Sequence, residues 1–98
     1  MAAYFVFSAA VTNPGLLESY RAATTATFEG HDVSVLVSTN EAEVIEGEPI
    51  GRRLVILRFP DTEAFHRWYE SPAYQAIIAM RHDSTEGAGL LAEGPDVT

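Results

Sequence analysis

The chain has 98 residues, of which 47% are hydrophobic and 20% charged, so it holds enough apolar material for one small packed domain. It contains no cysteine, which excludes disulfide frameworks, zinc-thiolate sites and catalytic thiols. Fourteen acidic residues against six arginines give a net charge of -8, and this charge disfavours binding to nucleic acid or to anionic membranes.

The sequence shows neither a cationic N-terminal segment followed by a long apolar stretch nor an apolar run of about 20 residues. We therefore expect a cytoplasmic protein that forms a single domain over residues 1–98, with an ordered core from about residue 4 to residue 94. A domain of this size buries only roughly 60 to 65% of its unfolded surface, which makes self-association a reasonable expectation.

The first half of the chain alternates strand and helix signals. Residues 4–11 are an apolar run that predicts a strand. Asn13 as a cap and Pro14 in the first turn predict a helix that continues over residues 16–28 and ends before Gly30. The β-branched segments 33–38 and 42–46 then predict either one bent strand or a hairpin.

The second half begins with residues 53–59, the strongest strand pattern in the chain. Asp61 is the predicted cap of a helix that runs through residue 70. Ser71 and Pro72 predict the start of a third, short helix that ends at about residue 81. Gly87 and Gly89 predict a loose entry to a last strand at residues 90–93.

The bent-strand option gives the order βαββαβ with an extra short helix, which is typical of a ferredoxin-like α+β sandwich. Segments 5–11 and 54–57 are apolar at both alternating positions, so both faces of the sheet need cover. The helices cover one face, and the simplest cover for the other is a second copy of the chain. We therefore predict a homodimer packed sheet to sheet, with Arg58 facing an acidic group of the partner.

Arg81 is the most informative single residue, because the predicted third helix places it on one apolar stripe with Tyr74. A guanidinium on such a stripe needs a carboxylate or a bound anionic oxygen, and Glu46 is the first candidate partner. One interpretation is a structural ion pair or a side chain that reaches water from the helix end. The other is a clamp for the carboxylate, enolate or phenolate of a small ligand.

Tyr20, Trp68 and Tyr69 fall on the inward sides of their helices, so their polar ends could meet above the sheet. Such aromatic stripes form either core or pocket. His82 is the preferred general acid or base, whereas His66 is expected on the exposed side of its helix; which of them lies near a pocket is open. The histidine spacing predicts no metal site, and the glycine spacing predicts no nucleotide cofactor.

Four segments together resemble a known family: residues 46–47 (EG), 53–60 (RLVILRFP), 68–75 (WYESPAYQ) and Arg81. They are similar to a domain-of-unknown-function family of the dimeric α/β-barrel superfamily, from about residue 4 to residue 94. The resemblance implies a homodimer with a dimeric α/β-barrel fold. The superfamily includes cofactor-independent monooxygenases acting on aromatic polyketides, small cyclases and isomerases, and the spacing of Trp68 and Tyr74 is similar to that of an aromatic pair lining the monooxygenase pockets.

We therefore expect a small-molecule enzyme of isomerase, cyclase or monooxygenase type, without an organic cofactor, in natural-product or aromatic metabolism. Its ligand would be aromatic or carbonyl-containing and would bind between sheet and helices. The candidate catalytic residues are His82, Arg81 and Glu46, and the candidate substrate-binding residues are Tyr20, Trp68, Tyr69 and Tyr74. The alternative is a non-catalytic, small-molecule-binding or stress-associated homodimer. A cavity of roughly a few hundred Å3 beside Arg81 favours the enzyme, and a filled core favours the alternative.

Overall fold

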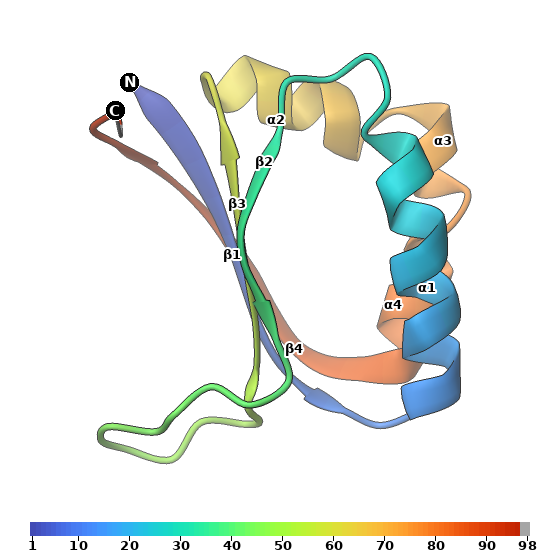
Figure 1. The fold of residues 1–98 in the computed structure, drawn as a ribbon, viewed down its shortest axis with the longest axis vertical. Coiled ribbons are helices and arrows are strands. Elements are labelled where there is room, and N and C mark those ends of the chain that lie inside the picture. The colour runs from blue at the N-terminus through green and yellow to red at the C-terminus, as the bar shows by residue number, and fades with distance from the viewer. Residues whose placement is uncertain (97–98) are drawn as a thin grey trace.

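A computed structural model describes residues 1–96 of the chain. Its strands and helices follow one another as β1 (Ala2–Val11), α1 (Pro14–Thr27), β2 (Ser34–Thr39), β3 (Arg53–Phe59), α2 (Thr62–Tyr69), α3 (Pro72–Gln75), α4 (Ile78–Ser84) and β4 (Thr85–Gly94) (Figure 1). None of the helices in this part of the chain has the length and apolar character that crossing a bilayer requires.

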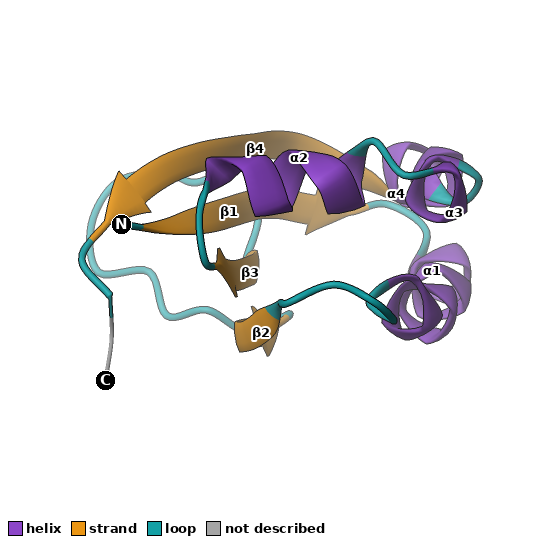
Figure 2. Ribbon diagram, turned by 90° about the horizontal axis from the view of Figure 1, so that it is seen from above, coloured by secondary structure: helices purple, strands orange, loops and turns teal. Residues whose placement is uncertain are grey.

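The four strands form one antiparallel sheet in the order β2-β3-β1-β4. The helices all lie on one side of this sheet, with α2 close above it and α1, α3 and α4 along one end (Figure 2). We call the face toward the helices the inner face and the opposite one the outer face. The arrangement confirms the predicted ferredoxin-like α+β fold.

Local signals set the helix starts where the sequence predicts them. The side chain of Asn13 accepts a hydrogen bond from the backbone N–H of Leu16, and Pro14 occupies the first turn of α1. Asp61 caps α2 in the same way through the N–H of Ala64, at 2.8 Å. Strand β3 has the predicted bounds, residues 53–59. The helix starts and the central strand are therefore determined locally.

The prediction of strand structure at residues 42–46 is wrong. Pairing between β2 and β3 ends at Thr39 and Leu54, and the chain between them forms a loop. Reciprocal hydrogen bonds between Ala42 and Arg52 close the base of this loop, and Gly47 turns it with a φ of 83°. Figure 1 shows the loop projecting from the sheet on the side opposite the helices. The β-branched residues at its tip have no neighbouring strand with which to pair.

The predicted third helix is divided into α3 and α4 around Ile77, and the last strand is longer than predicted. Gly87 and Gly89 lie inside β4 rather than in a loose entry to it. A Cβ at Gly89 would lie 2.8 Å from the ring of Phe5, and one at Gly87 would collide with the carbonyl of Ser8. These two glycines allow close approach of β4 to β1, which is why they occur within a strand.

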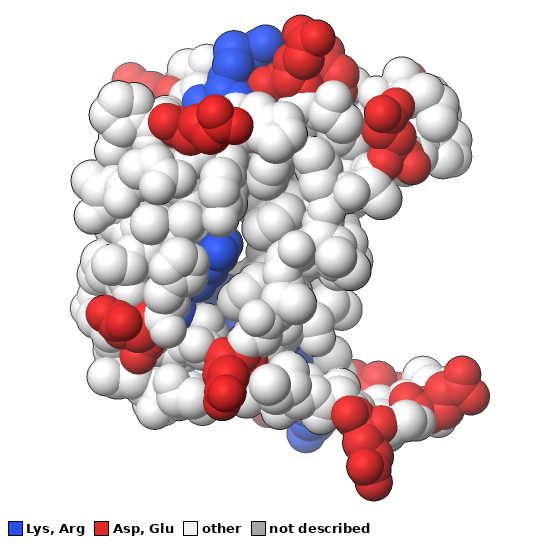
Figure 3. Space-filling model, turned by 180° about the vertical axis from the view of Figure 1, so that it is seen from behind, with Lys and Arg blue, Asp and Glu red and all other residues white. Residues whose placement is uncertain are grey.

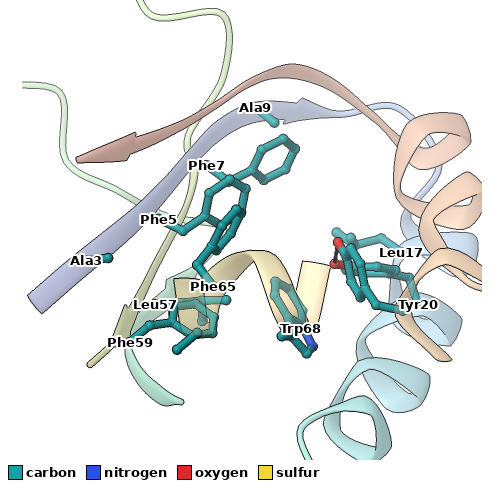
Figure 4. Packing of buried hydrophobic residues seen from close by; sticks show 12 residues of the cluster. Ala3, Phe5, Phe7, Ala9, Leu17, Tyr20, Leu57, Phe59, Phe65 and Trp68 are labelled. Atoms are coloured by element: carbon teal, nitrogen blue, oxygen red, sulfur yellow. Dashed lines mark hydrogen bonds between the residues drawn. The ribbon is translucent and has the colours of Figure 1, made fainter. Parts of the chain in front are cut away.

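The core lies between the inner face and the helices. Phe5 and Phe7 point from β1 toward the helical layer, while Leu17 and Tyr20 point back from α1 (Figure 4). Trp68 from α2 is 1% exposed and lies with its ring centroid 5.6 Å from that of Phe59 on β3. Aromatic packing therefore joins the helices to the sheet at one end.

The outer face of the sheet is also apolar, as the sequence predicts. Val6 on β1 lies opposite Ile56 on β3 and Leu90 on β4, so the three side chains share this face. Leu90 is 69% exposed, and no helix among the described residues covers it. A protomer on its own therefore leaves a continuous apolar strip in contact with water.

Substitution of Gly87 by Ala should lower the free energy of unfolding by about 1 to 3 kcal/mol, because the added Cβ collides with the backbone of β1. Urea denaturation measures the change. The matched control is Gly15→Ala in α1, whose added Cβ meets only the Asn13 side chain at 3.8 Å. Equal stability of the two variants would contradict the close approach of β4 to β1.

Candidate functional site

A cavity of about 460 Å3 separates the inner face of the sheet from α1. This volume is within the usual range for small-molecule sites. Its lining combines aromatic and aliphatic side chains with three arginines and one glutamate. The lining residues are Phe5, Phe7, Leu17, Glu18, Tyr20, Arg21, Ala22, Thr24, Thr25, Phe28, Val35, Ser38, Arg53, Val55, Leu57, Trp68 and Arg81.

Arg81 reaches the cavity from α4, whose end is fixed by several hydrogen bonds. The hydroxyl groups of Ser84 and Thr85 donate to the carbonyl oxygen of Arg81, at 3.3 and 2.7 Å. The carbonyl of Ser84 accepts from the backbone N–H of Thr12, which anchors the end of α4 to the start of α1. The backbone of Arg81 is therefore held in one position against the sheet.

The guanidinium of Arg81 is buried among aromatic groups, and the residue is only 7% exposed. It donates hydrogen bonds to the hydroxyl of Tyr74 at 3.0 Å and to the hydroxyl of Tyr69 at 3.5 Å. The Cζ atom of the guanidinium lies 4.7 Å from the ring centroid of Phe7. Its Nε is buried without a hydrogen-bond partner. No carboxylate in residues 1–96 lies within ion-pair distance of it, so its charge is met only by phenols and ring faces.

The charge states of this cluster follow from its surroundings. Burial alone would lower the pKa of Arg81, but the oxygens of Tyr74, Tyr20 and Tyr69 outweigh it and hold that pKa above its ordinary value. Burial raises the pKa of Tyr74 far above its usual range, Tyr20 adds to the rise, and the cation of Arg81 offsets only part of it. At neutral pH the cluster therefore contains a guanidinium cation and a neutral Tyr74 phenol.

The cluster reaches the cavity through Tyr20. The hydroxyl oxygens of Tyr20 and Tyr74 are 2.7 Å apart and hydrogen bonded, drawn as a dashed line in Figure 4. Arg81, Tyr74 and Tyr20 thus form a continuous chain of hydrogen bonds from α4 to α1. Trp68 is oriented separately, because its indole N–H donates to the hydroxyl of Thr27 at 3.0 Å.

Arg53 is a cavity residue that the sequence analysis did not single out. It lies at the start of β3 opposite Ala9, on the inner face, and is 4% exposed. Its Nη1 donates to the side-chain oxygen of Asn40 at 2.8 Å. Burial is the main cause that lowers the pKa of Arg53, and repulsion from Arg21 is the second. The alternation of side chains along β3 could have identified Arg53 as an inner-face residue, because it lies on the same side of the strand as Leu57 and Phe59.

The structure brings together five of the predicted site residues. Tyr20, Trp68 and Arg81 line the cavity, while Tyr74 and Tyr69 lie directly behind Arg81 and hydrogen bond to it. The sequence analysis placed the same residues on converging faces without establishing which of them touch.

Glu46 and His82 are not part of this cluster. Glu46 lies in the projecting loop and lines a separate groove with Ser8 and Leu54, so its predicted pairing with Arg81 is not formed. His82 is exposed on α4 and does not line the cavity. His66 is exposed as expected, and its Nδ1 lies 3.0 Å from Glu70. Within residues 1–96, no group of three His, Asp or Glu side chains is placed to hold a metal ion.

The charge distribution sets the cavity apart from the rest of the surface. Basic side-chain surface lies in the recess between the helices and the sheet, while acidic side chains lie around that recess and on the projecting loop (Figure 3). Three of the six arginines line the cavity, in a chain whose net charge is -8. The cavity is therefore an electropositive site in an acidic protein.

The sheet, the helices on one face of it and the cavity between them define a ferredoxin-like α+β protein. Its fold is similar to the fold of dimeric α/β-barrel proteins. The model of the DUF1330 family, a domain of unknown function, matches residues 2–95. The chain belongs to that family, in agreement with the expectation of a domain-of-unknown-function family. Among curated proteins, no match to this sequence was found.

Solved structures with the same fold cover most of the chain. RPA0582, a protein of unknown function from Rhodopseudomonas palustris, is 13% identical with a TM-score of 0.75, over 97% of this chain and 82% of that one. SnoaB, a cofactor-independent oxygenase from Streptomyces nogalater, is 18% identical with a TM-score of 0.66, and the match covers 98% of this chain and 95% of SnoaB. A Caulobacter crescentus protein provisionally described as an antibiotic biosynthesis monooxygenase is 15% identical with a TM-score of 0.59, over 93% and 85%.

Substitution of Tyr74 by Phe should lower the free energy of unfolding by about 1 to 3 kcal/mol, because it leaves the buried Arg81 and Tyr20 without a shared partner. Urea denaturation again measures the change. The matched control is Tyr4→Phe, which removes an exposed hydrogen bond to the carbonyl of Pro95. If the two substitutions cost the same, the hydrogen-bond chain does not stabilise the fold.

Proposed function

We propose that this protein is a small-molecule enzyme that binds an aromatic or carbonyl-containing substrate in the cavity and stabilises its enolate or phenolate form. The reaction is of isomerase, cyclase or monooxygenase type and uses no organic cofactor. The observation that carries this proposal is the buried Arg81 cation, which lines an aromatic cavity and has no carboxylate partner among residues 1–96. The oxygenase described for SnoaB supports the same chemical class.

The electrostatics of the site favour an ionised substrate oxygen. An anionic oxygen in contact with Arg81 replaces the water that the buried guanidinium has lost. Because apolar side chains form most of the lining around the buried Arg81, the attraction is stronger there than in bulk water. A cation at this distance typically lowers the pKa of an acidic hydroxyl by about 1 to 3 units. Arg81 therefore promotes ionisation of an enol or phenol and holds the resulting anion.

Tyr20 supplies a second hydrogen bond to the substrate. The oxygen of Tyr74 accepts from Arg81, and Tyr74 keeps its own proton because its pKa is raised. That proton is available for donation to the oxygen of Tyr20, which leaves the Tyr20 O–H directed at the cavity. A donor polarised through two hydrogen bonds to a cation is well suited to a developing oxyanion.

Three reaction types share this ionised species. In an isomerisation, a proton leaves one substrate atom and returns to another, so no co-reactant is needed. In a cyclisation, the enolate carbon attacks a carbonyl carbon of the same substrate. In an oxygenation, molecular oxygen enters as the co-substrate: one oxygen atom forms a carbon–oxygen bond with the substrate, and the other leaves as water with two hydrogens and the electrons that the substrate supplies. For each of them the residues of this chain bind the anion, orient its ring against Trp68 and exclude water.

The alternative function is a non-catalytic, small-molecule-binding homodimer. Among residues 1–96, no histidine lines the cavity, and the one carboxylate that does, Glu18, is 2.8 Å from Arg21 in an ion pair. A site without a free base at neutral pH can bind a ligand that is already ionised. Binding without turnover would therefore favour this alternative.

Ligand binding tests the role of Arg81. The dye 2-hydroxy-1,4-naphthoquinone is a flat hydroxyl acid that is ionised at neutral pH, and quenching of Trp68, the one tryptophan, reports its binding. We expect Arg81→Gln to weaken binding at least tenfold, because a hydrogen bond between charged groups is lost. The control, Arg67→Gln, removes an equal charge from the exposed side of α2 and should bind as the wild type does.

Turnover is measured with two probes, by oxygen uptake with anthrone and by the ultraviolet absorbance of phenylpyruvate tautomers. Turnover that Arg81→Gln abolishes supports the enzyme. Binding with neither activity points to the non-catalytic alternative, and an unchanged naphthoquinone affinity in Arg81→Gln contradicts the assigned site.

We also propose that the protein is a homodimer in which two outer faces pack together. This pairing would cover the apolar strip of Val6, Ile56 and Leu90. The projecting loop lies on the same side of the sheet and exposes Ile45, which is 82% accessible. Arg58, also on the outer face, is partly exposed and has only a 3.5 Å ion pair with Asp96, so its terminal nitrogens can donate to an acidic group of the partner.

Sedimentation velocity tests this assembly. The wild type should sediment as a dimer at micromolar concentration, and Leu90→Glu should sediment as a folded monomer because it places a charge in the apolar contact. The control, Ala73→Glu, adds the same charge at an exposed position of α3. A monomeric wild type, or a Leu90→Glu variant that remains dimeric, would rule out pairing through this face.

A further inference from the structure

We propose that the ligand of this cavity carries two acidic groups, one held by Arg81 and the other by Arg53, with an aromatic or other flat frame between them. This inference rests on the proposed function, because it assigns a substrate class to the same cavity. It adds a second anion-binding position and makes Arg53 a specificity-determining residue.

The charges lining the cavity support a ligand with more than one negative charge. Arg21, Arg53 and Arg81 contribute three cations, and Glu18 contributes the one carboxylate. Glu18 pairs with Arg21, since their side chains lie 2.8 Å apart. Arg53 and Arg81 remain, and within residues 1–96 neither has a carboxylate at ion-pair distance. Glu18 attracts Arg53 only from beyond ion-pair distance. Two buried cations without a carboxylate in direct contact are costly unless anions bind near them.

Arg53 is built into the cavity wall. It is 4% exposed, and Asn40 fixes one edge of its guanidinium through Nη1. Asn40 is neutral, so this contact orients the guanidinium without neutralising it. The guanidinium has five N–H donors in a planar fork, and its other edge is free to bind both oxygens of a carboxylate.

The two arginines line the same cavity from different elements, Arg81 from α4 and Arg53 from β3. The guanidinium of Arg81 lies over the ring of Phe7, and Phe7 is paired with Val55 on the neighbouring strand. Arg53 is two residues before Val55 on the same face of β3, which corresponds to roughly 7 Å along the strand. In this proposal the flat frame of the ligand rests on Phe7 and Val55, with one acidic group directed toward each arginine.

The rest of the protein surface makes this selection specific. At a net charge of -8 the molecule repels anions at long range, so a dianion gains only from contacts inside the cavity. The preference for a dianion should therefore depend on the two cavity arginines rather than on the overall charge.

The test compares 2,6-naphthalenedicarboxylate with 2-naphthoate, two probes with the same ring system and two or one carboxylate groups. Affinities of the full chain are measured by isothermal titration calorimetry in 0.15 M salt. At this concentration, electrostatic interactions between exposed charges are screened beyond about 8 Å. The wild type should bind the dicarboxylate at least tenfold more tightly. Arg53→Gln should remove this preference and leave the 2-naphthoate affinity within about twofold, whereas Arg81→Gln should weaken both probes.

Two controls separate a local effect from a general one. Arg52→Gln removes the same charge from the adjacent residue, which is exposed and hydrogen bonded to Ala42, and should keep the dicarboxylate preference. Arg53→Lys keeps the charge and lacks the planar fork, and should retain part of the preference. A thermal melt of each variant verifies folding, and Arg53→Lys gives the decisive comparison if Arg53→Gln does not fold.

The outcomes distinguish this inference from the proposed function. If 2-naphthoate binds through Arg81 and the dicarboxylate shows no gain that depends on Arg53, the second anion position is wrong and the proposed function stands. If neither probe binds to the wild type, the cavity is not an anion site and both proposals fail. Equal loss of the preference in Arg52→Gln would assign the effect to overall charge and overturn the role of Arg53.

Discussion

The functional account depends on one constraint: a buried guanidinium that contacts phenols and ring faces and, within residues 1–96, has no carboxylate at ion-pair distance. Arg81 stays charged in a protein interior, and burial of a charge is costly unless an opposite charge compensates it. Tyr74 and Tyr69 satisfy part of its hydrogen-bonding capacity and leave its charge unneutralised. The aromatic cavity beside it provides the space in which an anion can complete the compensation.

The same small chain faces a second constraint, which is the shortage of material to cover a sheet that is apolar on both faces. The helices pack on the inner face at one end, through Trp68 and Phe59, and stand away from it beside α1, where the cavity lies. The outer face, around Ile56, has no helix over it in residues 1–96.

The fold was predictable because its signals are local: Asn13 and Asp61 cap their helices, and the apolar alternation of residues 53–59 defines the central strand. The site was predictable only in part. Helical spacing placed Tyr74 near Arg81, but pairing of that cation with Glu46 was an assumption about tertiary distance, which spacing does not determine. Arg53 was overlooked although its position in β3 assigns it to the inner face, because a strand-terminal arginine resembles a surface residue until the opposite helix is known.

The pKa of a bound phenol tests the central claim most directly. Spectrophotometric titration of 4-nitrophenol, free and in complex with the wild-type protein, compares its ionisation in water with that in the cavity. If the uncompensated arginines dominate the site, the bound phenol should ionise at least about 1 pH unit lower than the free one. A bound pKa that is raised instead would show that burial outweighs the cations, and the account of an anion-stabilising site would be wrong.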